Sequence, residues 1–157
     1  MISSAFSPGR VGFGLLIASG LCSAQGGSRF GYAVSSGDVN GDGHGDVIVG
    51  EPFHDGPRTN AGRVLVYHGS PAGLAANPSW KRSGFQQGAQ LGKAVVALDV
   101  NGDAFDDLVV GAPGVDRAGW SPSMSVPAHQ SNPAAGDAGA IAVFLGSSGG
   151  LTSVPVL

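Results

Sequence analysis

One stretch of sequence occurs twice in this chain, and the repetition constrains the fold more than any other feature. The first copy, residues 30–50, reads FGYAVSSGDVNGDGHGDVIVG, and the second, residues 91–111, reads LGKAVVALDVNGDAFDDLVVG. A second pair follows at residues 61–74 (AGRVLVYHGSPAGL) and 138–151 (AGAIAVFLGSSGGL). Repetition of this kind predicts two copies of one structural module.

The second copy is longer than the first. The two members of the second pair lie further apart in the chain than the two members of the first pair, so the second copy carries an insertion between them. The insertion falls in a Ser-, Pro- and Ala-rich stretch at about residues 118–136, which predicts a long surface loop. We expect repeats over residues 25–88 and 89–157. The chain ends at GLTSVPVL where the first copy continues into GLAANPSWKRSGF, so we expect the last edge strand to be incomplete.

Short Val- and Ile-rich runs between clusters of Gly, Pro, Asn and Asp predict β-strands. The chain holds 28 glycines and 10 prolines, and no long stretch has apolar residues at helical spacing. The run at residues 64–68 is apolar on both faces, which is typical of a sheet covered on both sides. The sequence predicts an all-β fold of two four-stranded antiparallel sheets, as blades of a propeller or of another modular β array. The strands expected in the first copy cover about residues 31–36, 47–50, 64–68 and 79–85.

Charged residues are scarce and mostly acidic. Asp, Glu, Lys and Arg make up 12% of the chain, against about 25% in an ordinary soluble domain. The net charge is −3 and no cluster of Lys and Arg is present, which disfavours nucleic-acid binding.

The N-terminus resembles a secretory signal peptide. Arg10 precedes an apolar run at residues 11–21, and small residues around Ala24 suit a cleavage site. The run is too short to span a bilayer, and a buried N-terminal strand is the alternative. We expect residues 1–24 to be a signal peptide, with no transmembrane segment after cleavage and a secreted or cell-surface location. Cleavage would also remove the only cysteine, Cys22, so no disulfide could hold the loops.

The sequence predicts a calcium site in each repeat. Acidic and amide residues alternate along DVNGDGHGD (residues 38–46) and DVNGDAFDD (residues 99–107). Calcium takes six to eight oxygen ligands, and alternate spacing can aim side-chain oxygens at one centre, with a backbone carbonyl at the seventh position. Without a cation, the three carboxylates at the first, fifth and ninth positions of each loop would repel one another. The candidate ligands are Asp38, Asn40, Asp42, the His44 carbonyl and Asp46, and Asp99, Asn101, Asp103, the Phe105 carbonyl and Asp107.

Other interpretations of these loops remain open or are disfavoured. Solvated Asx-turns without metal are the alternative. An EF-hand is disfavoured because Val49 and Val110 stand where its bidentate Glu would be, and because the flanks are strand-like. Ala104 replaces Gly43 at the sixth position. If that position needs a positive φ, the second site should bind more weakly, and Asp106 adds a carboxylate that could partly offset this.

The combined motif resembles the FG-GAP repeat, the blade unit of the integrin alpha-chain β-propeller. Phe30-Gly31 and Gly50-Glu51-Pro52 flank the first acidic loop, and Leu91-Gly92 and Gly111-Ala112-Pro113 flank the second. The resemblance covers about residues 29–151. It implies four-stranded blades, calcium held by the loop aspartates, and a role in binding and adhesion. Similar repeats occur in secreted bacterial proteins and in a phospholipase that cleaves lipid anchors.

Two blades cannot close the seven-bladed ring that this resemblance implies. We expect an incomplete propeller: a piece of a longer protein, several chains that assemble, or two blades with exposed edges. The expected partners are an extracellular protein or glycan and further blades in the same or another chain.

The sequence favours a non-enzymatic role. The four histidines, His44, His54, His68 and His129, form no metal-binding or catalytic spacing. We therefore predict a calcium-binding module for protein or glycan binding or cell adhesion. The alternatives are a purely structural fragment of a larger propeller, or an accessory propeller of a larger extracellular enzyme such as a lipid-anchor-cleaving phospholipase or another hydrolase.

Overall fold

The computed structural model describes residues 27–116 and 139–156, and these fold into two antiparallel β-sheets without a helix. The first sheet has the order β1-β2-β3-β4 and the second the order β5-β6-β7. The all-β prediction is confirmed. The predicted signal peptide and inserted loop lie outside the described residues. The strands are β1 (Ala33–Gly37), β2 (Asp46–Glu51), β3 (Arg63–Tyr67), β4 (Trp80–Ser83), β5 (Ala94–Leu98), β6 (Asp107–Ala112) and β7 (Ala140–Phe144).

Each sheet is a meander of neighbouring strands that pair in sequence order. The four strands expected in the first repeat are all present, and every strand end lies within two residues of its expected position. The β1–β2 and β5–β6 hairpins pair in the same register, since Ala33 lies opposite Gly50 and Ala94 opposite Gly111. The repeat seen in the sequence is therefore a repeat of strand pairing.

The second sheet has three strands among the described residues. A bond from the Val156 N–H to the Val143 carbonyl (2.9 Å) matches the bond from the Ser79 N–H to the Val66 carbonyl (2.8 Å) just before β4. The segment around Val156 therefore lies along β7 at the place that corresponds to the start of β4.

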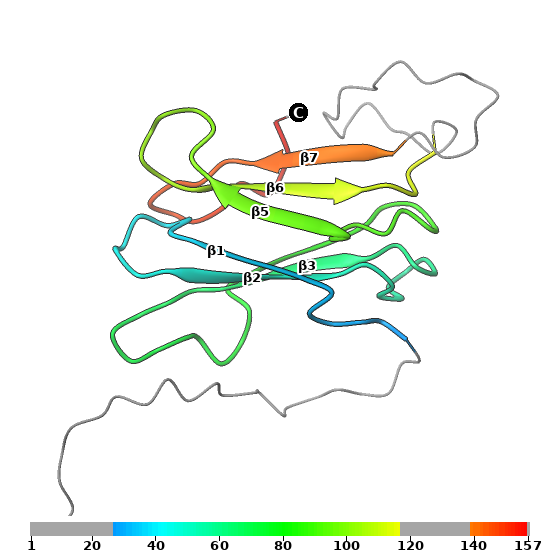
Figure 1. Cartoon of the computed structure of the whole chain (residues 1–157), viewed down its shortest axis with the longest axis horizontal. Helices are drawn as coiled ribbons and strands as arrows, with labels where there is room; N and C mark the ends of the chain where they lie inside the picture. Colours follow the sequence, from blue (N-terminus) through cyan, green and yellow to red (C-terminus); the bar gives the residue numbers. More distant parts are fainter. Residues whose placement is uncertain (1–26, 117–138, 157) are drawn as a thin grey trace, which may run out of the picture.

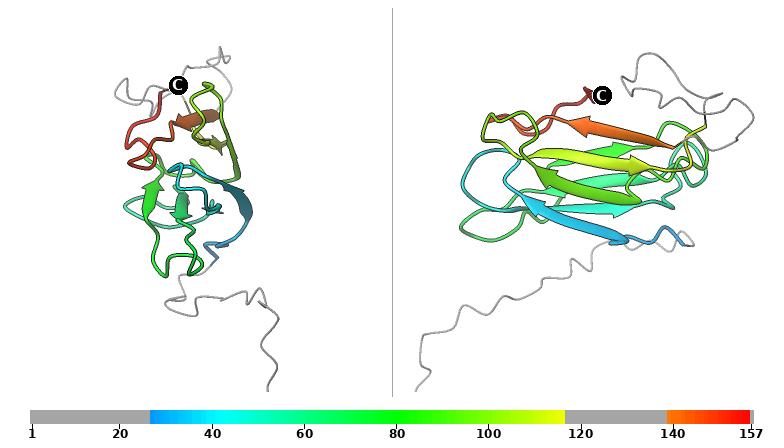
Figure 2. Two further views of the ribbon diagram at one scale, coloured as in Figure 1. Left: turned by 90° about the vertical axis from the view of Figure 1, so that its left-hand side faces the viewer. Right: turned by 45° about the horizontal axis from the view of Figure 1, so that its top comes forward.

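The hydrophobic core lies between the two sheets. Figure 1 shows the sheets one above the other, with β5 beside β1, and Figure 2 shows the same stack from its end. The core includes Ile48 and Val66 of the first sheet and Leu108 and Val110 of the second, all fully buried. Such branched side chains suit the pleated surfaces of packed sheets. In the same cluster, Trp80 of β4 packs edge to face on Phe144 of β7, with ring centroids 4.9 Å apart.

Missing side chains let the two sheets approach closely. A Cβ on Gly50 of β2 would lie 2.1 Å from the Gly92 carbonyl oxygen, and one on Gly37 would lie 2.6 Å from Ala97 Cβ. Glycine is therefore required at these positions for packing. No described residue belongs to a helix long and apolar enough to span a membrane.

Candidate metal centre in two hairpin loops

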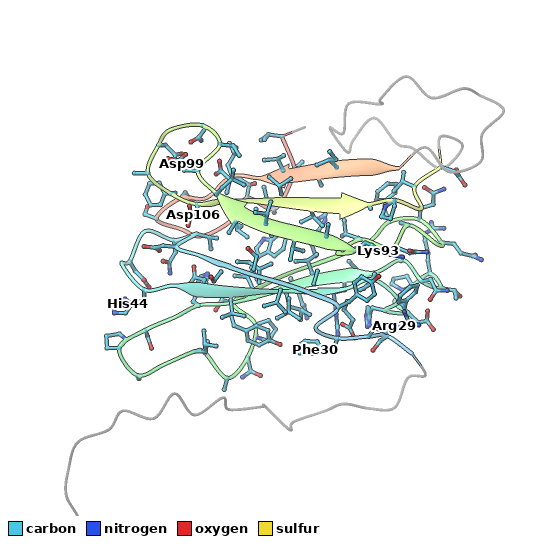
Figure 3. All side chains as sticks on the ribbon, in the orientation of Figure 1. Arg29, Phe30, His44, Lys93, Asp99 and Asp106 are labelled. Carbon is cyan, nitrogen blue, oxygen red and sulfur yellow. The ribbon has the colours of Figure 1, made fainter. Side chains whose placement is uncertain are left out.

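The two acidic loops connect the first two strands of each sheet and lie at the same end of the stack. The first joins β1 to β2 and the second joins β5 to β6. Figure 3 shows His44 of the first loop and Asp99 of the second at this end, away from Lys93 and Arg29. Both hairpins therefore present their polar side chains on one edge of the molecule.

Backbone N–H groups hold the aspartate at the first position of each loop. In the first loop, Asp38 accepts bonds from the N–H of Asp42 (3.1 Å) and of Gly43 (2.8 Å). In the second, Asp99 accepts bonds from the N–H of Gly102 (2.7 Å) and of Ala104 (2.9 Å). The bonds from Ala104 and Gly102 lower the pKa of Asp99, since they favour its ionised form.

The third and fifth positions form a linked pair. The Asn40 amide donates to Asp42 Oδ2 (3.0 Å), and the Asn101 amide donates to Asp103 Oδ2 (2.8 Å). The His44 N–H donates to Asp42 Oδ1 at 2.9 Å, and this bond, followed by that of Asn40, lowers the pKa of Asp42. Both loops thus share one arrangement of these two side chains near the surface.

The aspartate at the ninth position is fully buried in both loops, which sequence reasoning missed. Asp46 accepts bonds from the N–H of Val39 (3.0 Å) and of Gly69 (2.8 Å). Asp107 repeats this with the N–H of Val100 (3.0 Å) and of Gly146 (2.8 Å). Each side chain therefore ties its loop to the segment that follows the third strand. One signal in the sequence could have pointed to this partner: Gly69 and Gly146 occupy equivalent places in the two copies, in HGS and LGS.

The carboxylates alone do not complete a metal site. Within residues 27–116 and 139–156, no three His, Cys, Asp or Glu side chains are grouped so that they could hold an ion. The oxygens of Asn40 or Asn101 and of a backbone carbonyl would have to contribute. The donor set is nevertheless all oxygen, which suits calcium. No Lys or Arg of the described part forms an ion pair with a loop aspartate. The basic side chain beside the first loop's carboxylates is His44, whose Nδ1 lies 3.2 Å from Asp42 Oδ1.

The sixth position has a positive φ in both loops, at +81° for Gly43 and +71° for Ala104. A Cβ at Gly43 would meet nothing within 4 Å, so the backbone conformation alone disfavours alanine. We expect Ala104→Gly to raise the free energy of unfolding by about 1 kcal/mol and Gly43→Ala to lower it by about as much. Chemical denaturation of both variants in excess chelator checks this. Opposite signs support the strain, and equal signs contradict it.

The two loops also contact each other. Asp106 accepts a bond from the Asp38 N–H (2.8 Å) and donates its own N–H to the Asp38 carbonyl (3.0 Å). We expected Asp106 to add a carboxylate to the second loop, but its side chain turns to the first. The Phe105 ring likewise covers Gly41 of the first loop, where an added Cβ would lie 2.4 Å from it.

The opposite end of the stack carries a separate polar group. Arg63 donates two bonds to Glu51 Oε2, at 2.9 and 2.6 Å, and His54 Nδ1 lies 3.8 Å from the same oxygen. Burial, followed by the Arg63 charge, lowers the pKa of His54. Lys93 lies over the rings of Tyr32 and Phe53, 5.6 and 5.1 Å from their centroids.

Comparisons with known proteins agree with this geometry. The FG-GAP repeat family matches residues 30–67 and 91–144. The chain is 40% identical over 94 residues to phosphatidylinositol-glycan-specific phospholipase D of Mus musculus. That alignment covers 56% of this chain and 11% of the phospholipase. It is 44% identical over 97 residues to integrin alpha-PS2 of Drosophila melanogaster, covering 57% of this chain and 7% of the relative.

The similarity to integrin alpha-5 of Xenopus laevis is longer: 31% identity over 134 residues, 82% of this chain and 11% of the relative. The chain thus spans about a tenth of the length of these relatives. The family matches cover both acidic loops and all strands except β4. With its two sheets as propeller blades, the chain belongs to the FG-GAP repeat family.

Proposed function

We propose that the chain is an extracellular, non-catalytic binding module whose two hairpin loops are stabilised by calcium. The proposed units are a signal peptide at residues 1–24 and blades at residues 25–88 and 89–157. The observation that carries the proposal is the pair of matching loops. Each loop has carboxylates near the surface, and no Lys or Arg of the described part forms an ion pair with them. The acidic side chains of each loop are otherwise mutually repulsive.

The first loop would hold the ion through Asp38, Asn40, Asp42, the His44 carbonyl and Asp46. A bound calcium ion would supply the positive charge that the loop lacks. The residues' own part is orientation: backbone N–H groups already fix the Asp38 carboxylate, and the Asn40 amide would release Asp42 Oδ2. Asp46, held by two backbone bonds, anchors the base of the loop.

The second loop would use the equivalent groups, with one difference. Ala104 carries the strained positive φ where the first loop has Gly43. We therefore expect the second site to bind calcium more weakly than the first. Its ligands would be Asp99, Asn101, Asp103, the Phe105 carbonyl and Asp107.

Calcium is expected to raise the thermal stability of the protein, because a ligand that binds only the folded state shifts the unfolding equilibrium. The gain is about 2.7 kcal/mol for a site at 100 times its Kd. Asp42→Ala should remove most of the first site's share, and Asp103→Ala the smaller share of the second. Differential scanning calorimetry with and without millimolar calcium measures these shifts.

Asp55→Ala is the matched control, because Asp55 is an exposed acid outside both loops. Its calcium-induced shift should equal that of the unmodified protein. An unmodified protein whose melting temperature does not respond to millimolar calcium would contradict the proposal. So would an Asp42→Ala variant with an undiminished response.

The proposed ligand is an extracellular protein or glycan, and the integrin relatives support a role in adhesion. Capture of surface glycans or matrix proteins by the immobilised chain, with and without chelator, tests this. Binding that calcium supports and the chelator removes agrees with the proposal. A complete lack of calcium-dependent capture opposes it.

The phospholipase relatives favour a second candidate, an accessory propeller of a larger extracellular enzyme. The two candidates share the blades and differ in what adjoins them. A hydrolase domain encoded in the same reading frame would support the second candidate, and further repeats without one would support the first.

A further inference from the structure

Each sheet has an inner face in the core and an outer face turned away from the other sheet (Figure 2). The outer face of the second sheet carries exposed Val96, Leu98 and Ile141, and we call it the second outer face. The outer side of the first sheet carries exposed Phe30, Val34 and Leu74, and we call it the first outer face. Six large apolar side chains in two groups are more than scattered surface residues, and patches of this kind mark interaction sites.

The second outer face repeats the inner face of the first sheet. Val100 is the repeat equivalent of Val39, and Ile141 is the equivalent of Val64. Val39 and Val64 are both 0% exposed in the core between the sheets, whereas Val100 is 48% and Ile141 is 59% exposed. The same positions are thus covered by a following sheet in the first repeat and left open in the second.

The first outer face repeats the inner face of the second sheet in the same way. Phe30 is 57% exposed and its equivalent Leu91 is 6% exposed; Leu74 is 53% exposed and its equivalent Leu151 is 9% exposed. Leu91 and Leu151 both belong to the core. The two outer faces are therefore the two halves of the interface that already joins the sheets.

We propose that the second outer face docks a second copy of this chain, which binds head to tail through its first outer face. The contact continues the existing interface between the two sheets by one further step. The inference deepens the proposed function and rests on it in one respect, because it names a copy of this chain as the source of the further blades.

Notches for this contact are already present. In the existing interface the backbone of Gly50 receives the carbonyl oxygen of Gly92, which lies 2.1 Å from where a Cβ would be. Gly111 is the equivalent of Gly50, and a Cβ added there would meet only its own sheet neighbour Ala94. Gly31 is the equivalent of Gly92, and a Cβ added there would meet nothing within 4 Å. Gly31 and Gly92 share a positive φ, +81° and +89°. Gly111 can therefore receive the Gly31 backbone of a second copy.

One position differs between the two interfaces, and the difference is complementary. Gly37 leaves room for the Asp106 carboxylate, whose Oδ2 lies 2.5 Å from where a Cβ would be. At the equivalent place the second outer face has the larger Leu98, and the first outer face of the incoming copy has Gly45, which has no side chain. Gly45 leaves room where Asp106 stands in the existing interface, whereas Ser36 stands where Ala97 does, so the two sheets must lie slightly further apart at Leu98. This pairing fits a copy of the first repeat and disfavours a copy of the second, which would bring Asp106 against Leu98.

The loops show a further match. Phe105 covers Gly41 in the existing interface, and a Cβ on Gly41 would lie 2.4 Å from its ring. The equivalent of Phe105 is His44, whose side chain is 39% exposed, and the equivalent of Gly41 is Gly102, where an added Cβ would meet nothing within 4 Å. A planar ring would again lie over a glycine.

Head-to-tail contacts between unlike faces give a ring where the rotation closes and an open chain where it does not.

Analytical ultracentrifugation of the full chain in calcium tests the proposal. We expect concentration-dependent association. Ile141→Glu and Phe30→Glu each place a charge in the contact and should weaken association by about tenfold or more. Both residues are more than half exposed, so the single chain should stay folded. Gly111→Ala fills the notch without adding charge and should also weaken association.

Thr59→Glu adds the same charge at an exposed residue of the β2–β3 loop, whose carbonyl accepts the Gly88 N–H of the β4–β5 connection, and should change nothing. A mixture of Ile141→Glu and Phe30→Glu decides the geometry. Each variant keeps the face that the other has lost, so one-to-one dimers should form from two monomeric samples.

Several outcomes would overturn the proposal. These are a protein that stays monomeric at every concentration, association that Ile141→Glu and Phe30→Glu leave unchanged, and a mixture that does not dimerise. If Ile141→Glu weakens association and Phe30→Glu does not, two second outer faces meet each other and the head-to-tail contact is wrong. A monomer whose melting temperature still rises with calcium overturns this inference alone, and association without a calcium response overturns the calcium proposal alone.

Discussion

Asp46→Ala is expected to lower the free energy of unfolding by roughly 3–5 kcal/mol, measured by chemical denaturation in excess chelator. The Asp46 carboxylate is fully buried and accepts the N–H groups of Val39 and Gly69. Removing it leaves two buried donors without a partner, and a hydrogen bond to a charged group is worth about 1.5–3 kcal/mol. The chelator removes any contribution from bound calcium, so the loss reports the backbone bonds.

Asp46→Asn is the matched variant. It keeps one carbonyl oxygen and turns an amide toward the other donor, so we expect about half of the loss. Asp107→Ala should behave like Asp46→Ala, because Asp107 binds Val100 and Gly146 in the same way. If Asp46→Ala costs less than about 1 kcal/mol, the two bonds do not stabilise the fold as described.

Gly50→Ala is expected to destabilise the protein by about 3 kcal/mol, because the new Cβ would lie 2.1 Å from the Gly92 carbonyl oxygen. That atom belongs to the backbone, so no side-chain rotation can relieve the contact and the sheets must move apart. Thermal or chemical unfolding at low protein concentration measures the loss.

The repeat supplies the control for this prediction. Gly111 occupies the same place in the second sheet, and its Cβ would approach only Ala94, at 3.4 Å. Neither glycine has a positive φ, so both alanines adopt an ordinary backbone conformation. Gly111→Ala should stay within about 1 kcal/mol of the unmodified protein. Equal losses at the two positions would show that strand propensity, and not the contact between the sheets, decides the effect.

The amino-acid sequence was enough to predict the strands, their order within each hairpin and the two acidic loops. These follow from local chemistry: β-branched runs extend, Gly, Asn and Asp bend the chain, and the repetition places both loops in one register. A positive φ at Gly43 and Ala104 entered the sequence analysis only as a condition, and the structure shows it at both positions. The FG-GAP resemblance was visible in the same residues.

Which loop atoms are buried, and what they bind, depends instead on how the two sheets pack. The ninth-position Asp46 reaches Gly69, 23 residues away, and Asp106 reaches Asp38, 68 residues away, across the gap between the sheets. These partners depend on how the third strand returns and how the sheets stack, and no local spacing encodes either. The exposure of Val100 against the burial of Val39 has the same cause. Equivalent residues in a repeat have equal local preferences, and only what packs against them makes them differ.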